Sequence, residues 1–246
     1  MPGTLLFRGE LALVTGSASN IGRGIALALS REGASVVLVD IDADRNAGVA
    51  RDIGAAGGAP ETVTADLSSK DGWRGVLEAL GNRVPQMLVH SACPRRHEKD
   101  TPLAVDEATF DGMLNTNVRS GFFLGREVGG RMRAAGIKGR MLFITSLHAE
   151  SPRNLPHYSA SKAGMTMIMK ELARDLGPAG IRVNALAPGA VPGGGAANIT
   201  TEYGAKIPLR RTGTADDMAG PAMALLCDRF SGYVTGTTVA VDGGLA

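Results

Sequence analysis

The residues with the clearest chemical potential are a tyrosine and a lysine four positions apart, Tyr158 and Lys162. At helical spacing their side chains lie on one face, one turn apart. An ammonium beside a phenol stabilises the phenolate, so the pair favours proton exchange with an alcohol or a carbonyl near neutral pH. Upstream, Ser146 follows the run MLFIT, where a strand should end and where open α/β sheets place functional groups. Such pairs also occur on many amphipathic helices without a function, so this interpretation depends on the rest of the chain.

A glycine-containing turn near the N-terminus has the chemistry to bind a nucleotide. The segment TGSASNIG, residues 15–22, lies between the apolar run 11–15 and a helical pattern at 23–32. Its glycines let the backbone approach a pyrophosphate, and amide groups at a helix N-terminus bind it. The next strand ends at Asp40, near the spacing at which a carboxylate accepts hydrogen bonds from the adenosine ribose. That charge repels a 2′-phosphate and Ile41 adds no cation, so we expect NAD rather than NADP.

Apolar runs and helical patterns alternate along the whole chain. Strands are expected at 11–15, 35–40, 61–65, 86–91, 140–145, 181–187 and 237–241, and helices at 23–32, 43–55, 70–80, 106–134, 156–176 and 214–226. This alternation predicts one α/β domain over residues 1–246, a doubly wound parallel sheet (Rossmann fold) with helices on both faces. The stretch 188–213 reads as a long loop, and we expect about 190–213 to be a substrate loop.

Composition narrows the class of partner. Lys and Arg total 26 against 24 Asp and Glu, a net charge of +2, which gives no electrostatic case for nucleic acid or an anionic membrane. No apolar run approaches the roughly 20 residues that a transmembrane helix needs. Cys93 and Cys227 lack metal-ligand spacing, so no metal is expected. The N-terminus has no secretory leader pattern, and we therefore expect a cytoplasmic protein with a small-molecule partner.

The order of these motifs resembles the short-chain dehydrogenase/reductase family. The matching features are TGSASNIG, Asp40, Asp66 with Leu67, Asn117, Ser146, YSASK, Pro188 with Gly189, and a terminal VDGG. The resemblance covers nearly the whole chain, and its joint order and spacing are specific. It implies an oxidoreductase that transfers a hydride between NAD(H) and a secondary alcohol or ketone. The helices at 106–134 and around Tyr158 are similar to the pair that relatives use to build a homotetramer.

The resemblance also implies residue roles. Tyr158 would exchange the substrate proton, Ser146 would hydrogen-bond the reacting oxygen, Lys162 would support Tyr158 and hold the nicotinamide ribose, and Asn117 would support a water that relays protons. The implied cofactor-binding residues are Gly16, Ser19, Asn20, Ile21, Gly22, Asp40, Ile41, Asp66, Leu67, Ser91, Ala92, Tyr158, Lys162, Pro188, Gly189 and Val191. The substrate is expected to meet Ser146, His148 and Tyr158.

The chain departs from the family pattern at three places. Asn20 stands where glycine or alanine is common, a mild change because asparagine tolerates a left-handed backbone. Ser91, Ala92 and Cys93 stand where relatives have Asn, Ala and Gly, so Cys93 is expected to narrow the site. Gly193 replaces a threonine that contacts the cofactor amide, which predicts weaker binding of NAD.

Substrate signals are few. The segments 94–100 and 148–157 should border the mouth of the site, and the His and Glu that follow Ser146 resemble sugar and polyol dehydrogenases of the family. We therefore expect a sugar or polyol. A 3-oxoacyl thioester reductase that uses NADPH remains an alternative, and so does a non-catalytic nucleotide-binding regulator.

Overall fold

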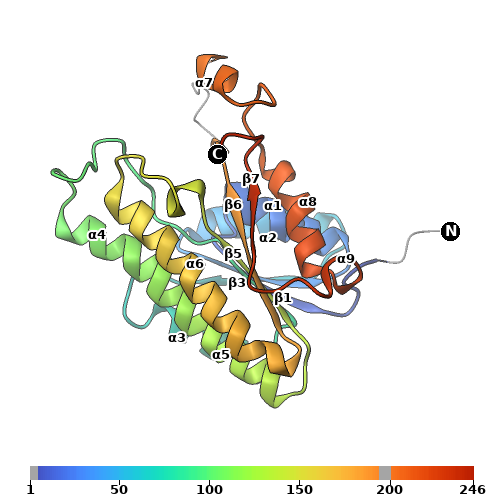
Figure 1. Cartoon of the computed structure of the whole chain (residues 1–246). Coiled ribbons are helices and arrows are strands. Elements are labelled where there is room, and N and C mark those ends of the chain that lie inside the picture. The colour runs from blue at the N-terminus through green and yellow to red at the C-terminus, as the bar shows by residue number, and fades with distance from the viewer. Residues whose placement is uncertain (1–4, 194–200) are drawn as a thin grey trace.

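The core is one sheet of parallel strands whose order reverses near its middle. The computed structural model describes residues 5–193 and 201–246, apart from the side chains of 201–203. Within them the sheet has seven strands in the order β3-β2-β1-β4-β5-β6-β7 (Figure 1). The strands are β1 Leu11–Thr15, β2 Ser35–Asp40, β3 Pro60–Thr64, β4 Met87–His90, β5 Arg140–Ile144, β6 Arg182–Pro188 and β7 Thr238–Val241. The order changes direction between β1 and β4, and ligands of such sheets bind at the carboxyl ends of the strands at that point.

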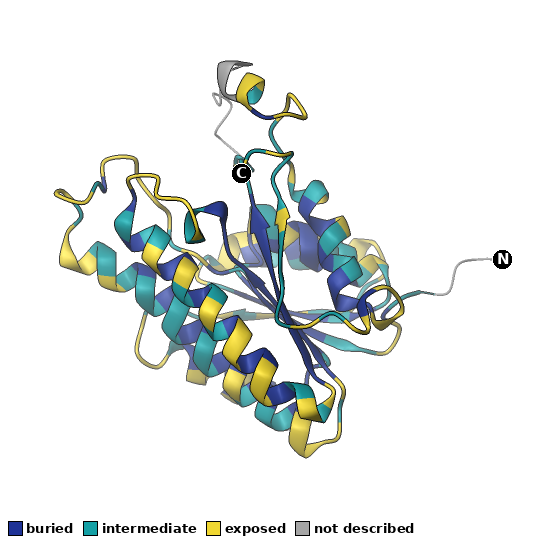
Figure 2. Ribbon diagram, viewed as in Figure 1, coloured by how far each residue is buried: buried dark blue, intermediate teal, exposed yellow. Residues whose placement is uncertain are grey.

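Helices cover both faces of the sheet (Figure 1). On one face lie α1 Asn20–Arg31, α2 Ala43–Ala55 and α8 Ala215–Leu226, and on the other α3 Gly72–Leu80, α5 Ser120–Ala134 and α6 Pro156–Leu176. Residues along each strand alternate between the two apolar layers, so Leu13 packs into one and its neighbours Ala12 and Val14 into the other. Figure 2 shows the central strands buried from end to end, as expected for a sheet covered on both sides. The predicted fold class is confirmed.

The helix predicted over 106–134 is interrupted. It comprises α4 Glu107–Leu114, a π-helical turn η1 at Asn115–Arg119, and α5. A π-helical turn accommodates one extra residue and is frequent at functional sites. The hydrophobic pattern gave no sign of it, because a single wide turn barely disturbs a helical period. Asn117 lies in this turn.

Other boundaries moved by small amounts. α1 begins at Asn20 rather than near residue 23, because Ser19 takes the extended backbone of an N-cap and the end of the glycine turn forms the first helical turn. β6 runs on through Pro188, and the predicted loop that follows contains the short helix α7 Thr201–Lys206. Residues 194–200 of that loop lie outside the described residues. The remaining short helices are η2 Leu147–Ala149, η3 Gly177–Ala179 and α9 Asp228–Ser231.

Two further findings concern the described residues only. None of their helices combines the length and the apolar character needed to cross a membrane. They also contain no cluster of three or more His, Cys, Asp or Glu side chains that could hold a metal ion.

Candidate active site

A cleft of about 1930 Å³ opens along the carboxyl ends of the strands. Segments that follow β1, β2, β3, β4, β5 and β6 line it together with the first turns of α6. Every residue predicted to bind the cofactor lies in its wall: Gly16, Ser19, Asn20, Ile21, Gly22, Asp40, Ile41, Asp66, Leu67, Ser91, Ala92, Tyr158, Lys162, Pro188, Gly189 and Val191. Ser146 and His148 line the same cleft, so these two predicted substrate residues and Tyr158 share one site with the nucleotide-binding residues.

The glycine turn is shaped so that no side chain intrudes. Gly16 has a φ of +67°, and a Cβ there would come within 2.7 Å of the backbone nitrogen of Ala92. A Cβ at Gly22 would lie 2.0 Å from the carbonyl oxygen of Gly16. Ser19 caps α1 without a side-chain hydrogen bond, which leaves the first amide groups of the helix available to a ligand. A turn without intruding side chains and with several available N–H donors fits the pyrophosphate of a dinucleotide.

Asp40 accepts two hydrogen bonds from the protein backbone, in addition to the contact with the adenosine ribose that is predicted for it. Its Oδ2 accepts the backbone N–H of Ala18 at 2.9 Å, and its Oδ1 accepts that of Asp42 at 3.1 Å. The carboxylate therefore holds the glycine turn against the end of β2. A carboxylate has about four lone-pair sites, so Asp40 retains capacity to accept from a ribose hydroxyl.

A buried histidine joins the glycine turn to the π-helical turn, and the sequence analysis did not identify it. Thr15 Oγ1 accepts from the backbone N–H groups of Ser91 and Ala92, both at 3.2 Å, so its single hydrogen goes to His90 Nδ1 at 3.0 Å. The Nε2 of His90 then carries the proton and donates it to the carbonyl oxygen of Asn117 at 3.2 Å. Burial, and next the charge of Lys162, lowers the pKa of His90 to about 4, which keeps the ring neutral.

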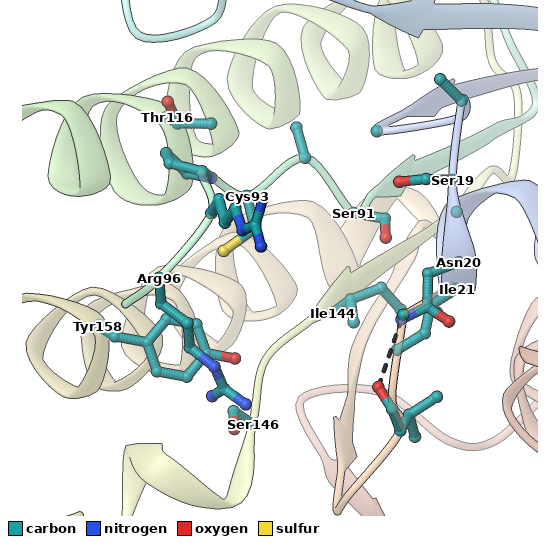
Figure 3. A pocket seen from close by; sticks show the side chains of 18 of the residues that line it. Ser19, Asn20, Ile21, Ser91, Cys93, Arg96, Thr116, Ile144, Ser146 and Tyr158 are labelled. Atoms are coloured by element: carbon teal, nitrogen blue, oxygen red, sulfur yellow. Dashed lines mark hydrogen bonds between the residues drawn. The ribbon is translucent and has the colours of Figure 1, made fainter. Parts of the chain in front are cut away.

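Tyr158 and Lys162 lie together at the start of α6. Lys162 Nζ is 5.5 Å from the centre of the Tyr158 ring and donates to the carbonyl oxygen of Ile144 at 2.8 Å. That carbonyl belongs to the end of β5, so the strand anchors the ammonium. Lys162 is 2% exposed and Ser146 is 6% exposed, and Ser146 begins η2 with its Oγ accepting the backbone N–H of His148. Figure 3 shows Ser146 near the hydroxyl end of Tyr158.

Asn117 is buried beneath Tyr158 and Lys162 and does not line the cleft. Its Nδ2 donates to Ser161 Oγ at 2.8 Å, and Ser161 in turn donates to the carbonyl oxygen of Tyr158. Asn117 is fully buried, and its Oδ1 has no hydrogen-bond partner among the described residues. Its side chain thus fixes α4 and η1 to the first turn of α6, and the predicted proton-relaying role stays a prediction.

The substrate side of the cleft brings two aromatic rings and an arginine together. His148 meets the Tyr158 ring edge to face, with centroids 4.9 Å apart, and its Nδ1 is 3.5 Å from Ser159 Oγ. Burial, followed by the charges of Arg96, Arg153 and Lys162, lowers the pKa of His148 to about 4. His148 is therefore neutral at pH 7 and offers a substrate a hydrogen bond rather than a charge. The guanidinium of Arg96 lies over the Tyr158 ring, 4.7 Å from its centre, and its Nη1 is 3.4 Å from His148 Nε2.

The departures from the family pattern have visible local effects. Asn20 has a φ of 43°, so the asparagine does adopt the left-handed backbone, and its Nδ2 donates to the carbonyl oxygen of Val191 across the cleft (Figure 3). Cys93 lines the cleft and its thiol lies 3.5 Å from Asn117 Nδ2. Gly193 also lines it, exposed and beside Asn20.

Comparison with known proteins gives consistent matches. A family model described as enoyl-(acyl carrier protein) reductase matches residues 16–246. The chain is 32% identical to L-rhamnose 1-dehydrogenase (NAD(P)(+)) of Azotobacter vinelandii over 98% of both chains. It is also 32% identical to (3R)-3-hydroxyacyl-CoA dehydrogenase of Mus musculus, over 100% of this chain and 99% of that protein. A solved structure assigned as an NAD(P)-dependent gluconate 5-dehydrogenase of Beutenbergia cavernae, with NADP bound at low occupancy, superposes with a TM-score of 0.90 at 34% identity over 99% of both chains.

Proposed function

This chain belongs to the short-chain dehydrogenase/reductase family, and we propose that it is an NAD-dependent dehydrogenase of secondary alcohols whose substrate is a sugar or a polyol. Its relatives are NAD(P)-dependent enzymes that act on CH–OH groups, and this chain is an oxidoreductase of that class. The observation that carries the proposal is the placement of Tyr158 and the anchored Lys162 in the same cleft as the bare glycine turn.

We assign the chemical steps to four residues. Tyr158 takes the hydroxyl proton of the alcohol, and Ser146 hydrogen-bonds the same oxygen. Lys162, fixed by the Ile144 carbonyl, stabilises the negative charge on the phenol and holds a ribose hydroxyl. Asn117 keeps the first turn of α6 in place through Ser161, and its free Oδ1 supports a buried water that carries the proton onward.

The cleft fits a dinucleotide, which would supply the hydride acceptor when bound. The glycine turn would hold the pyrophosphate and Asp40 the adenosine ribose. Asp66 and Leu67 would flank the adenine, and Val191 would bind near the nicotinamide amide. We favour NAD because a carboxylate at Asp40 would repel a 2′-phosphate and Ile41, which lines the cleft beside it, offers no counter-charge.

A second candidate is a 3-oxoacyl thioester reductase. The similarity to (3R)-3-hydroxyacyl-CoA dehydrogenase supports it, because both reactions exchange a hydride at C3 of an acyl thioester. A non-catalytic regulator is disfavoured because the four residues of the proposed mechanism are all present.

We further propose that one domain spans residues 1–246, with about 190–213 as its substrate loop, and that the protein is a cytoplasmic homotetramer. The tetramer is supported by the resemblance of the helices at 106–134 and around Tyr158 to the pair that relatives use to assemble. Both cysteines are free, which suits a reducing compartment.

The function is tested with Tyr158→Phe, which keeps the ring and removes the oxygen. Wild-type protein screened against sugars, polyols and hydroxy acids should produce NADH with at least one of them. The variant should keep its circular dichroism spectrum and its binding of NADH while turnover falls roughly 100- to 10,000-fold. Lys162→Met should also cripple turnover, and the double variant should lose little more, because residues acting as a unit are not additive. Near-normal turnover by Tyr158→Phe would refute the mechanism.

A further inference from the structure

The half of the cleft next to Tyr158 carries a surplus of positive charge. Its charged lining residues are Arg95, Arg96, Arg153 and Lys162, against Glu98. The half formed by the segments after β1, β2 and β3 is balanced, with Arg23, Arg45 and Arg51 against Asp40, Asp52 and Asp66. One end of the same cleft is thus neutral in sum, and the other attracts anions.

Arg96 is the member of this group closest to the chemistry. Its guanidinium lies over the Tyr158 ring at 4.7 Å, and its Nη1 is 3.4 Å from His148 Nε2. Among the described residues, no carboxylate lies within 4.0 Å of it. The contact with His148 engages only Nη1, so the edge formed by Nε and Nη2 keeps its N–H groups for a ligand, and that edge matches the two oxygens of a carboxylate or phosphate.

The lowered pKa of His148 reflects its burial and the same local charge. After burial, the next causes that lower its pKa are three cations, Arg96, Arg153 and Lys162. The neutral imidazole beside Arg96 therefore adds no charge of its own to the site. Its Nε2, 3.4 Å from Arg96 Nη1, helps to hold the guanidinium over the Tyr158 ring.

The cofactor does not account for these arginines. A pyrophosphate belongs at the glycine turn, and a 2′-phosphate would lie beside Asp40 and Ile41. Figure 3 shows Arg96 with Tyr158 and Ser146 on one side of the cavity, and Ser19, Asn20 and Ile21 across it. The unpaired cation is therefore left for the substrate.

We propose that the substrate is an anionic secondary alcohol, with a carboxylate or phosphate group that binds to Arg96 while its hydroxyl meets Ser146 and Tyr158. The proposal rests on the function proposed above and narrows its substrate class from polyols in general to polyhydroxy acids or polyol phosphates. Arg153 and Arg95 add to the attraction but lie outside direct contact with the Tyr158 ring, so Arg96 decides the selectivity.

The test compares alcohols that differ in one end group. D-Gluconate and D-sorbitol form a matched pair, carboxylate against hydroxymethyl, and D-sorbitol 6-phosphate provides the phosphate arm. The quantity measured is the ratio of kcat/KM for each anion to kcat/KM for D-sorbitol, with NAD as the oxidant. A ratio is required because Arg96 also touches Tyr158, and any effect on the tyrosine changes both substrates alike.

In Arg96→Gln this ratio should fall roughly 10- to 100-fold, the usual effect of a lost charge-assisted hydrogen-bond pair. Arg96→Lys keeps the charge but loses the planar pair of N–H groups, so its ratio should lie between those of wild type and Arg96→Gln. Lys99→Gln is the matched control, because Lys99 is an exposed cation of the same loop outside the cleft lining, and its ratio should equal that of wild type. An unchanged ratio in Arg96→Gln would overturn the inference. If the ratio falls more for D-gluconate, Arg96 binds a carboxylate; if it falls more for D-sorbitol 6-phosphate, Arg96 binds a phosphate.

A binding measurement separates failure of this inference from failure of the proposed function. Calorimetric titration of D-gluconate and D-sorbitol 6-phosphate into the NADH-saturated protein requires no turnover. If none of the three alcohols is oxidised, the proposed function fails for this class. Binding that weakens in Arg96→Gln and not in Lys99→Gln would still uphold the anion site, whereas equal affinity in wild type and both variants would reject it.

Discussion

Replacing His90 should remove a pH dependence of stability that its burial creates. The ring is fully buried, bonded to Thr15 through Nδ1 and to the Asn117 carbonyl through Nε2, with its pKa lowered from 6.5 to about 4 mainly by burial. Between those two pH values the unfolded chain binds a proton at this position and the folded chain does not. Stability from this group is therefore fully present above about pH 6.5 and is lost as the pH falls toward 4.

The size of the effect follows from the two pKa values. Each pKa unit is worth about 1.4 kcal/mol, so the whole drop from 6.5 to about 4 corresponds to about 3 kcal/mol of unfolding free energy. Between pH 7 and pH 5 the wild type should lose about 2 kcal/mol through His90 alone. Charging the ring would also place a cation near Lys162 and force Nδ1 to donate toward the Thr15 hydroxyl, which would have to give up its present hydrogen bond.

The variant is His90→Asn, whose amide can accept from one partner and donate to the other, with His90→Gln as a second choice if the first folds poorly. Urea unfolding at pH 7 and pH 5, at one fixed protein concentration, gives the loss of stability for each protein. The loss on acidification should be about 2 kcal/mol smaller in the variant than in the wild type, whatever the variant's stability at pH 7. Equal losses in both proteins would mean that His90 does not stay neutral in the fold between pH 7 and pH 5, and the lowered pKa would be refuted.

The remaining predictions concern cofactor choice and assembly. The double variant Asp40→Asn with Ile41→Arg keeps an acceptor for the Ala18 N–H, removes the repelling charge and adds a cation for the phosphate. The ratio of kcat/KM with NADP to kcat/KM with NAD should therefore rise roughly 10- to 100-fold. A wild type that already prefers NADP would contradict the role proposed for Asp40. Multi-angle light scattering at micromolar concentration should give the mass of four chains of 25.4 kDa each, and a monomer would contradict the homotetramer.

The sequence predicted the fold well because its signals are local. Continuous apolar strands such as 35–40 and the glycine turn at 15–22 each identify an element without reference to distant residues. The same is true of Tyr158 and Lys162, which one helical turn brings together. Boundaries shifted only where capping or a neighbouring strand decided them, as at Ser19.

The features that escaped prediction depend on contacts between distant segments. His90 is an ordinary strand-ending residue until the fold places the Asn117 carbonyl against its ring. Arg96 is one of several charged residues in the segment 94–100, and only the path of that loop selects it to lie over Tyr158. The π-helical turn at Asn115–Arg119 places the Asn117 carbonyl against His90 and the Asn117 side chain against Ser161, and it leaves no trace in residue spacing.

Asp40 constrains how this enzyme could evolve toward another coenzyme. The carboxylate that we propose binds the adenosine ribose is also the acceptor that ties the Ala18 N–H to the end of β2. A substitution that removes the acceptor oxygens together with the charge, such as Asp40→Ala, would loosen the loop that must bind either dinucleotide, so that first step of a change in preference weakens binding of both. A lineage is therefore expected to pass through asparagine or serine at this position, or to gain a cation nearby before the carboxylate is lost.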